Sequence, residues 1–197
     1  MDLLVQLLAN GLVNGSHYAL LALGFGLIFG TTRVVHFAYG PIYAVSAYGA
    51  WVLAAHFGAP LWVAMLGSIV TGAVLGVLSY IVVYRPFERR GSPPLVVLIA
   101  SLGLFIVIEN AIGVVFGTDT KVVPNPPSGI LLLGPLVVTG SQMLQVGAFV
   151  VVSIALGLYL TRARMGKAVL AMTDNAEMAR VIGIDTARVS IIAFAIG

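Results

Sequence analysis

Residues 95–117 read LVVLIASLGLFIVIENAIGVVFG, an apolar run that holds a single charged side chain, Glu109. A helix of about 20 apolar residues is long enough to cross the hydrocarbon core of a bilayer. The run is continuous and does not alternate, so it predicts a transmembrane helix and argues against a strand. This stretch indicates the class of fold, a helical membrane protein.

The same pattern recurs along the chain. Of its 197 residues, 60% are hydrophobic and only 9% are charged, whereas a soluble domain carries about 25% charge. The predicted fold class is therefore all-α: a polytopic transmembrane helical bundle with about five complete spans plus the start of a sixth. We expect the other spans near residues 3–30, 41–57, 61–84 and 141–160, and the start of the sixth at 189–197.

Two of these runs are unusual. The run at 41–57 is the shortest and follows the segment FAYGP, which suits either a break or a partly re-entrant element. The run at 189–197 would reach only about 14 Å as a helix, about half of a hydrocarbon core. We therefore expect the chain to be the N-terminal part of a longer protein with further spans.

Basic residues predict the direction of the spans. They gather in the loops that follow the first, third and fifth runs, while the 118–140 loop holds Lys121 as its one cation. Loops rich in Lys and Arg stay on the cytoplasmic side, so the N-terminus is expected outside. The net charge of +3 is small and divided among loops, which argues against nucleic-acid binding. The cytoplasmic cations are Arg33, Arg85, Arg89, Arg90, Arg162, Arg164, Lys167, Arg180 and Arg188.

No catalytic or cofactor-binding constellation is found. The chain has no cysteine, its three histidines have no metal-ligand spacing, and it has no phosphate-binding loop of the GxxxxGK[ST] type. We expect no enzyme activity, no metal, and no cofactor in this chain. His36 and His56 lie near span ends, where a polar tip in the interface is ordinary.

Polar residues inside the spans are candidates for a solute path. Glu109 and Asn110 lie towards the outer end of the fourth span, where a carboxylate is costly. Glu109 is also explained by a hydrogen bond to a neighbouring helix or by snorkelling to the interface. A polar group in the first span either lines a path or bonds across helices, and it comprises Asn10, Asn14, Ser16, His17 and Tyr18. Of these, Asn14, Ser16 and Tyr18 are the candidate path residues.

Glycines spaced four apart predict close helix contacts. In lipid, small residues let helix backbones approach one another. We expect these pairs to pack inside one subunit, with a subunit–subunit interface as the alternative. The pairs are Gly11 with Gly15, Gly26 with Gly30, Gly72 with Gly76, and Gly113 with Gly117.

The segment 162–188 is the longest polar, basic stretch and reads RARMGKAVLAMTDNAEMARVIGIDTAR. A short helix over 175–182 is expected, with Asp174 and Glu177 forming a capping box and Gly183 ending the helix in a left-handed conformation. So short a helix is unstable alone, so it needs a surface to pack on. That surface is a partner, the same subunit or the membrane interface. Its apolar face comprises Met178, Val181 and Ile182, with Arg180 elsewhere on the turn.

Three stretches resemble the permeases of bacterial branched-chain amino-acid ABC importers. They are NGLVNGSHYALLALGFGLIFGTTRVVHFAYG at 10–40, YRPFERRGSPPLVVLIASLGL at 84–104, and RARMGKAVLAMTDNAEMARVIGID at 162–185. Together they favour the H-type subunit of the high-affinity leucine, isoleucine and valine importers. Relatives continue well beyond residue 197, and they tend to carry a neutral polar residue where this chain has Glu109.

The resemblance implies a fold, partners and a mechanism. Residues 1–197 would be a single transmembrane permease domain in the bacterial inner membrane, with 162–188 as its cytoplasmic coupling loop. It would pair with a second related permease subunit, two cytoplasmic ATPase subunits that bind the ATP, and a periplasmic solute-binding protein. The coupling helix would comprise Asp174, Glu177, Met178, Arg180, Val181, Ile182 and Gly183, the apolar residues docking into a groove of the ATPase and Glu177 and Arg180 making polar contacts.

Three rival functions are considered. A urea or short-amide ABC permease shares the same motifs. An ion-coupled secondary transporter often buries several ionisable groups at mid-membrane, and this chain has one candidate, Glu109, off-centre. A membrane-embedded enzyme needs polar catalytic groups at one depth, and the sequence shows none.

Overall fold

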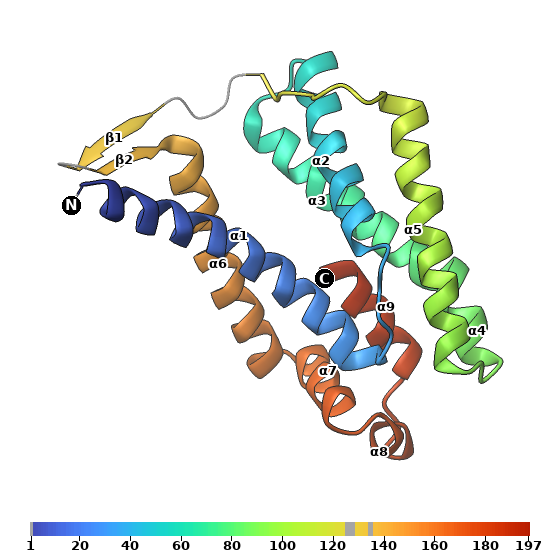
Figure 1. Cartoon of the computed structure of the whole chain (residues 1–197). Coiled ribbons are helices and arrows are strands. Elements are labelled where there is room, and N and C mark those ends of the chain that lie inside the picture. The colour runs from blue at the N-terminus through green and yellow to red at the C-terminus, as the bar shows by residue number, and fades with distance from the viewer. Residues whose placement is uncertain (1, 125–128, 134–135) are drawn as a thin grey trace. The chain divides into compact units, whose positions relative to one another are not determined.

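The computed structural model describes residues 2–124, 129–133 and 136–197 (Figure 1). The all-α fold class predicted from the sequence is confirmed, because helices form most of this part of the chain. The helices in chain order are α1 (Asp2–Thr32), α2 (Tyr39–His56), α3 (Leu61–Ser79), the π-helical segment η1 (Tyr80–Tyr84), α4 (Arg85–Arg89), α5 (Pro94–Phe116), α6 (Gly140–Arg162), α7 (Arg164–Asp174), α8 (Ala176–Val181) and α9 (Thr186–Ile196).

Four helical stretches among the described residues are long and apolar enough to cross a membrane: Leu3–Thr32, Leu61–Arg89, Pro94–Phe116 and Gly140–Arg162. They match the first, third, fourth and fifth expected spans. The second expected span forms a helix of 18 residues, α2, but it is not one of the four. Its tyrosines, glycines, proline and histidine lower its mean hydropathy, which explains the difference from the expected five spans.

Two short strands lie outside the long apolar runs, in the segment between α5 and α6. β1 (Ile130–Leu133) and β2 (Leu136–Thr139) pair antiparallel, with Ile130 opposite Thr139 and Leu133 opposite Leu136. The sequence argues against strands only within the apolar runs, and these two strands of four residues each lie outside them. Pairing the strands satisfies their backbone groups locally, and β-branched residues favour extended backbone.

Backbone contacts divide the chain into two compact units. Unit 1 comprises Met1–Gly24 and Asn125–Lys167, and unit 2 comprises Phe25–Pro124 and Ala168–Gly197. Each unit is described by itself. The helices α1 and α7 run continuously from one set of residues into the other.

Amide side chains hold unit 1 together. Gln6 Oε1 accepts a hydrogen bond from the backbone N–H of Val137 (2.9 Å), and Gln6 Nε2 donates one to the backbone carbonyl of Val137 (3.0 Å). Gln142 Nε2 donates to Asn10 Oδ1 (3.2 Å), and Gln145 Nε2 donates to the Val13 carbonyl (3.0 Å). Bonds of this kind join helices in a membrane, where no hydrophobic force drives them together.

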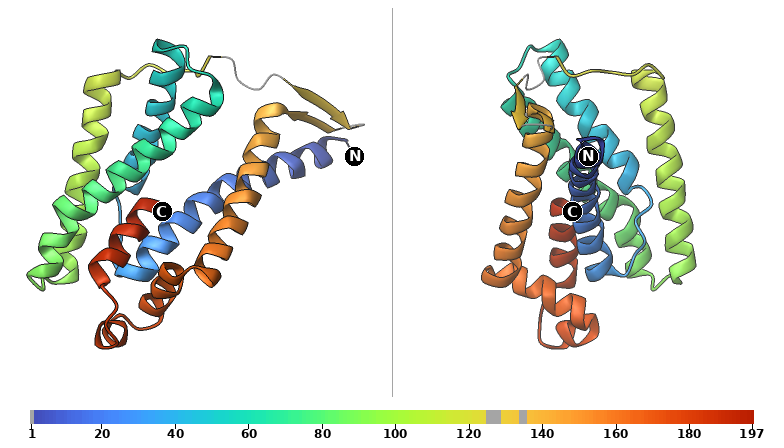
Figure 2. Two further views of the ribbon diagram at one scale, coloured as in Figure 1. Left: turned by 180° about the vertical axis from the view of Figure 1, so that it is seen from behind. Right: turned by 60° about the vertical axis from the view of Figure 1, so that its left-hand side comes forward.

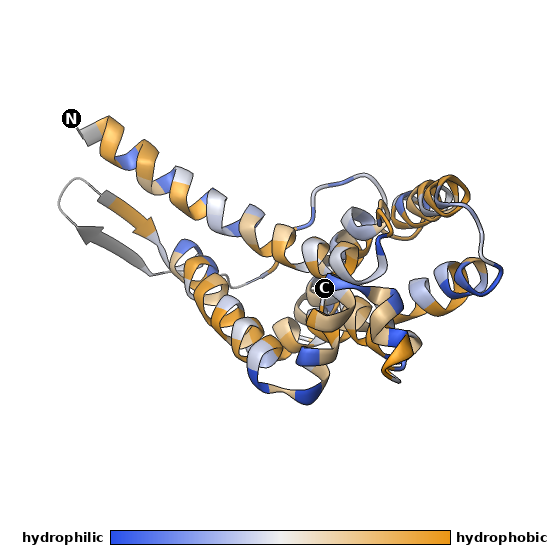
Figure 3. Ribbon diagram, turned by 90° about the horizontal axis from the view of Figure 1, so that it is seen from below, coloured by the Kyte–Doolittle hydropathy of each residue, from blue (hydrophilic) through white to orange (hydrophobic). Residues whose placement is uncertain are grey.

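Helix α6 begins at a capping box. Thr139 Oγ1 accepts from the Gln142 N–H (3.4 Å), and Gln142 Oε1 accepts from the Thr139 N–H (2.9 Å). These bonds satisfy two donors that a helix start leaves without partners. Hydrophobic residues cover most of α6, and hydrophilic residues gather in the segment that follows it (Figure 3).

In unit 2, α3 packs against α2 on one side and α9 on another, and α2 also contacts α5 (Figure 2). The glycine pair of α3 allows these contacts. A Cβ on Gly72 would lie 3.4 Å from Ser46 Cβ, and a Cβ on Gly76 would overlap the Phe194 carbonyl. This pair packs inside the chain as predicted.

The other glycine pairs behave differently. Gly30 lies against Thr173, but a Cβ on Gly11, Gly15, Gly26 or Gly113 would meet no atom of the described chain within 4 Å. The same holds for Gly117, the partner of Gly113. The described residues therefore supply no helix neighbour for these five glycines, and their packing inside one subunit stays a prediction.

The core of unit 2 lies where η1 meets α9. Ile28, Tyr80, Tyr84 and Phe194 are all at most 2% exposed and form one cluster. A π-helical turn widens the backbone ladder locally and is frequent at functional sites. Here it places Tyr80 and Tyr84, four residues apart, in the same core.

Candidate functional site

Helix α7 begins at a sharp corner after α6. Ala163 is extended, with φ −73° and ψ 144°, and Gly166 lies directly against the backbone of Tyr159 and Leu160. A Cβ on Gly166 would overlap the Tyr159 carbonyl oxygen, which cannot move without breaking the end of α6. The glycine of the RARMGK stretch therefore allows the corner that starts the 162–188 segment.

Asn175 caps α8, the short helix of this segment. Its side chain accepts a hydrogen bond from the Met178 N–H at 2.9 Å. Asp174 is instead the last residue of α7. The predicted capping box of Asp174 with Glu177 is therefore wrong, because Asp174 is taken up by α7, a helix that was not predicted, and Asn175 becomes the cap. Both residue types are good caps, so the sequence did not distinguish them.

The predicted left-handed glycine at the end of α8 is confirmed. Gly183 has φ +88°, and its N–H donates to the Arg180 carbonyl at 3.1 Å. The Ile184 N–H donates to the Ala179 carbonyl at 3.0 Å. This pair of bonds is the Schellman motif, which satisfies carbonyls at a helix end.

The apolar residues of α8 face outward. Met178 is 58% exposed, Val181 80% and Ile182 67%, while Ala179 is buried at 2%. Glu177 and Arg180 are exposed as well. A six-residue helix, capped at both ends, therefore presents an apolar face that the described chain does not cover.

Helix α9 follows at once and leads into the core. Asp185 caps it by accepting from the Arg188 N–H at 3.2 Å. Near its other end, the Phe194 ring lies among three aromatic rings, with centroid distances of 5.1 Å to His36, 5.2 Å to Tyr80 and 5.3 Å to Tyr84. Phe194 is 2% exposed. The short chain between Phe194 and α8 connects this buried ring with an exposed helix.

A buried polar network lies beside Phe194. The Tyr84 hydroxyl donates to Ser101 Oγ at 2.8 Å, and Ser101 Oγ also accepts from the Phe37 N–H at 2.8 Å. His36 Nδ1 lies 2.6 Å from the same tyrosine oxygen. Since the tyrosine proton is given to Ser101, His36 Nδ1 carries the proton of that bond.

The sequence suggested that His36 is a polar tip at the membrane interface, and the structure shows that this is wrong. It is 2% exposed, and burial lowers its pKa to about 4. The imidazole is neutral at pH 7 for this reason. The sequence could not show this, because the partners of His36 lie 48 residues away at Tyr84 and beyond.

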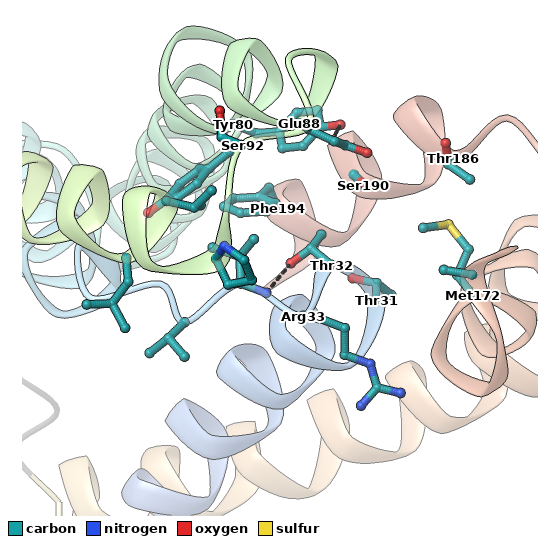
Figure 4. Close-up of a pocket in the computed structure, with 18 of the residues that line it drawn as sticks. Thr31, Thr32, Arg33, Tyr80, Glu88, Ser92, Met172, Thr186, Ser190 and Phe194 are labelled. Carbon is teal, nitrogen blue, oxygen red and sulfur yellow. Dashed lines mark hydrogen bonds between the residues drawn. The ribbon is translucent and has the colours of Figure 1, made fainter.

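A cavity of about 580 Å³ lies in unit 2 next to this core (Figure 4). The Tyr80 hydroxyl donates to Glu88 Oε2 at its edge, at 2.8 Å. Arg33, Glu88 and Arg180 all line it, so the turn after α1, helix α4 and helix α8 meet around one cavity of unit 2. The sequence predicted that these segments share one side of the membrane.

The candidate path residues of α1 have different surroundings. Asn14 and Tyr18 are exposed, whereas Ser16 is 6% exposed and its hydroxyl donates to the Val13 carbonyl at 2.7 Å. Asn10, their neighbour, bonds across helices to Gln142.

The candidate path residues of α5 are both exposed. Asn110 Nδ2 donates to the Ile106 carbonyl of its own helix at 2.7 Å. Glu109 makes no hydrogen bond or ion pair with the described chain. These two residues belong to unit 2, and Asn14, Ser16 and Tyr18 belong to unit 1.

Sequence reasoning missed several residues of this region. Tyr80 and Tyr84 carried a signal, since two tyrosines four apart in an apolar span share one helix face. Ser101, Phe194 and Arg33 carried none, because their importance comes from contacts with residues distant in the sequence.

Taken with its apolar helices, this arrangement defines a multi-pass membrane protein with an exposed helix at one end. Residues 7–197 match the family described as the branched-chain amino acid transport system permease component, and the chain belongs to this family.

Similar proteins carry matching names. The chain is 31% identical over 206 residues to the high-affinity branched-chain amino acid transport system permease protein BraD of Pseudomonas aeruginosa, covering 98% of this chain and 66% of BraD. It is 28% identical over 207 residues to LivH of Escherichia coli K12, which bears the same description, covering 98% and 66%. It is 27% identical to a probable LivH of Methanocaldococcus jannaschii, covering 91% and 58%. The chain thus spans no more than 66% of these relatives. No solved structure matches it.

Proposed function

We propose that this chain is a permease subunit of an ABC importer, in which it forms part of the pathway for branched-chain amino acids and couples that pathway to cytoplasmic ATPase subunits. Membership of the family and the names of BraD and LivH support this proposal. The protein is a transport subunit and not an enzyme, and ATP is bound by its partners. A second related permease, two ATPase subunits and a periplasmic solute-binding protein complete the importer.

The observation that carries the proposal is the exposed apolar face of α8. A helix of six residues does not stay folded on its own propensity, so its caps and its surroundings must hold it. Its large apolar residues lie outside the core, where a groove on an ATPase can receive them. The docking residues are Met178, Val181 and Ile182, with Glu177 and Arg180 as polar contacts beside them and Asp174 and Gly183 at the boundaries of the helix.

Movement of α8 is passed on through α9. The Schellman turn and the Asp185 cap leave few free torsions between the two helices. Phe194 fits among three rings, and Gly76 lets α3 approach its carbonyl. Closure of the ATPases on ATP would therefore move η1 and α3 along with α8, and so switch the pathway between its two sides.

We propose that the solute path passes the polar residues of α1 and α5. The side chains of Ser16 and Asn110 bond to their own helices, which leaves their capacity for a solute reduced. Asn14, Tyr18 and Glu109 are exposed and have polar groups available for a passing solute.

We also propose that the protein lies in the bacterial inner membrane with α8 on the cytoplasmic side. The meeting of Arg33, Glu88 and Arg180 around one cavity supports a shared side for these segments. Positive loops stay in the cytoplasm, which puts the N-terminus outside. The domain 1–197 then presents residues 162–188 to the ATPases as its coupling loop.

The test is uptake of labelled leucine in cells that lack the gene and in cells complemented with the native gene. Labelled urea runs in parallel, and an inactive ATPase subunit serves as the control. Complementation of leucine uptake that needs the active ATPase is the expected result. Complementation of urea uptake alone would assign the chain to the urea permeases, and uptake that ignores the ATPase would contradict the ABC assignment.

A further inference from the structure

Arg33 has an unusual backbone at the end of α1. It is the one non-glycine residue with a positive φ in the described part of the chain, at +56°. Its N–H donates to the Phe29 carbonyl at 2.8 Å, so it closes α1 in the left-handed conformation that usually requires glycine. An arginine in this conformation is strained, and such strain persists where the surroundings fix the residue.

The Arg33 side chain bonds to the last turn of α7. Its Nη2 donates to the Thr173 carbonyl at 3.0 Å. The last four carbonyls of a helix have no partner within it and carry partial negative charge. A guanidinium therefore suits this position in both hydrogen bonding and charge. Figure 4 shows the Arg33 side chain extending away from Phe194, so it does not belong to the aromatic core.

A second contact joins the same two helices. A Cβ on Gly30, one turn before Arg33, would lie 3.3 Å from the Thr173 methyl carbon. Thr173 Oγ1 donates to the Val169 carbonyl at 3.0 Å, which fixes the rotamer of Thr173. The end of α1 thus holds Thr173 by its carbonyl and by its methyl group. We name the three residues Gly30, Arg33 and Thr173 the α1–α7 clamp.

The clamp lies next to the coupling helix. Thr173 is two residues before Asn175, the cap of α8. A displacement of α8 must therefore move the clamp or break it. On the other side, α1 is one continuous helix that also carries Asn14 and Tyr18.

We propose that Arg33 is a positioning residue that makes α1 follow the coupling helix, giving the importer a second line of transmission beside α9 and Phe194. This inference rests on the proposed function. Arg33 is exposed, so its bond contributes little to folding. Its role is to hold α1 and α7 together while α8 moves.

The first test removes the bond in the complete importer, reconstituted in proteoliposomes with its partners. Arg33→Ala removes the side chain, and Arg33→Gly removes it while easing the backbone. Both variants should assemble with the ATPases and hydrolyse ATP, but leucine taken up per ATP should fall about threefold, as expected for one lost hydrogen bond at an exposed charged side chain. Arg90→Ala is the matched control, because Arg90 is exposed and its side chain bonds to nothing in the described chain.

The second test restores the link by another bond. The chain has no cysteine, so Gly30→Cys with Thr173→Cys introduces one defined pair. A Cβ on Gly30 would lie 3.3 Å from Thr173 Cγ2 and 3.6 Å from Thr173 Oγ1, so a sulfur in the γ position of residue 173 comes close to a cysteine at residue 30. In the Arg33→Ala background, oxidation of this pair should recover uptake per ATP, and a reductant should abolish the recovery. A variant that had merely misfolded would not respond in this way.

Unchanged uptake per ATP in both Arg33 variants would overturn the proposal, and so would a disulfide that forms in the Arg33→Ala background without restoring uptake per ATP. Failure of the native importer to couple leucine uptake to ATP would instead reject the proposed function. If the Arg33 variants do not accumulate in the membrane, the proposal is tested in the chain that keeps Arg33 and carries the cysteine pair, by measuring uptake per ATP after oxidation. Full uptake with the helices locked supports joint movement of α1 and α7, and blocked uptake contradicts it.

Discussion

The aromatic core around Phe194 and the short helix α8 are neighbours in sequence with opposite surroundings. Phe194 is 2% exposed and contacts three rings, and the polar atoms of Tyr84 and Ser101 bond to one another. Val181, 13 residues earlier, is 80% exposed. The backbone of α8 is satisfied at both ends, but its apolar side chains are not covered.

This difference separates residues that serve folding from residues that serve assembly. Substitutions in the core should change the stability of the chain. Substitutions on α8 should leave stability unchanged and alter the association with ATPases. Each prediction below tests one side of this distinction.

The largest effect is expected at Gly76. Gly76→Ala introduces a Cβ that overlaps the Phe194 carbonyl, and a backbone atom cannot step aside as a side chain can. The free energy of unfolding in detergent should fall by about 3 kcal/mol. Gly26→Ala is the control, because a Cβ there meets no atom of the described chain within 4 Å, and it should be neutral or slightly stabilising. Equal stability of the two variants would contradict the close approach of α3 and α9.

The stability of the core should depend on pH through His36. Its pKa is lowered to about 4 from 6.5, so the unfolded chain binds a proton more readily. The stabilisation that comes from keeping His36 neutral is fully present above pH 6.5. As the pH falls towards 4, the free energy of unfolding decreases by about 3 kcal/mol in all. Thermal unfolding of the native chain across this range should show the loss, and His36→Asn should flatten it. His56→Asn changes an exposed histidine and should keep the native profile. The same flattening in both variants would refute the role of His36.

A smaller loss is expected for Tyr84→Phe. The substitution removes the hydroxyl that bonds both Ser101 and His36 and leaves buried polar atoms without partners. Denaturant unfolding should report a loss of about 2 kcal/mol. Tyr48→Phe keeps the ring that stacks on Phe116 and should have no measurable effect. A Tyr84→Phe variant as stable as the native chain would mean that the network does not support the core.

The smallest change in stability is expected for Val181→Asp. The side chain is 80% exposed, so unfolding should be unchanged within about 0.5 kcal/mol. Co-purification of ATPase subunits should nevertheless weaken by about tenfold or more, because a charge would enter an apolar groove. Val122→Asp, at a 73% exposed position in the segment that follows α5, is the control for an exposed charge outside the membrane spans and should retain the ATPases. Stability loss with normal ATPase association would reverse the distinction drawn above.

The sequence predicted what depends on local pattern. The long apolar runs correctly predicted four spans. The glycine after a short helix correctly predicted the left-handed conformation of Gly183. It failed where a choice depends on the neighbouring helix or on distant residues. Asn175 caps α8 because α7 extends through Asp174. His36 can be buried because it forms a hydrogen bond with the hydroxyl of Tyr84, 48 residues further along the chain.

Site prediction divides in the same way. The α8 residues were found because a short apolar face is visible in a polar segment. The Arg33–Thr173 bond joins residues 140 apart, so no local pattern announces it. The residues of the solute path stay predictions.

The most direct test of the central claim is a cross-link from α8 in the assembled importer. Since the chain has no cysteine, Val181→Cys and Val122→Cys each carry one thiol outside the membrane spans. A thiol-to-amine cross-linker should join Cys at 181 to an ATPase subunit, in an amount that changes with ATP, and should not do so from 122. Equal or absent ATPase adducts from the two positions would contradict the claim that α8 docks on the ATPase.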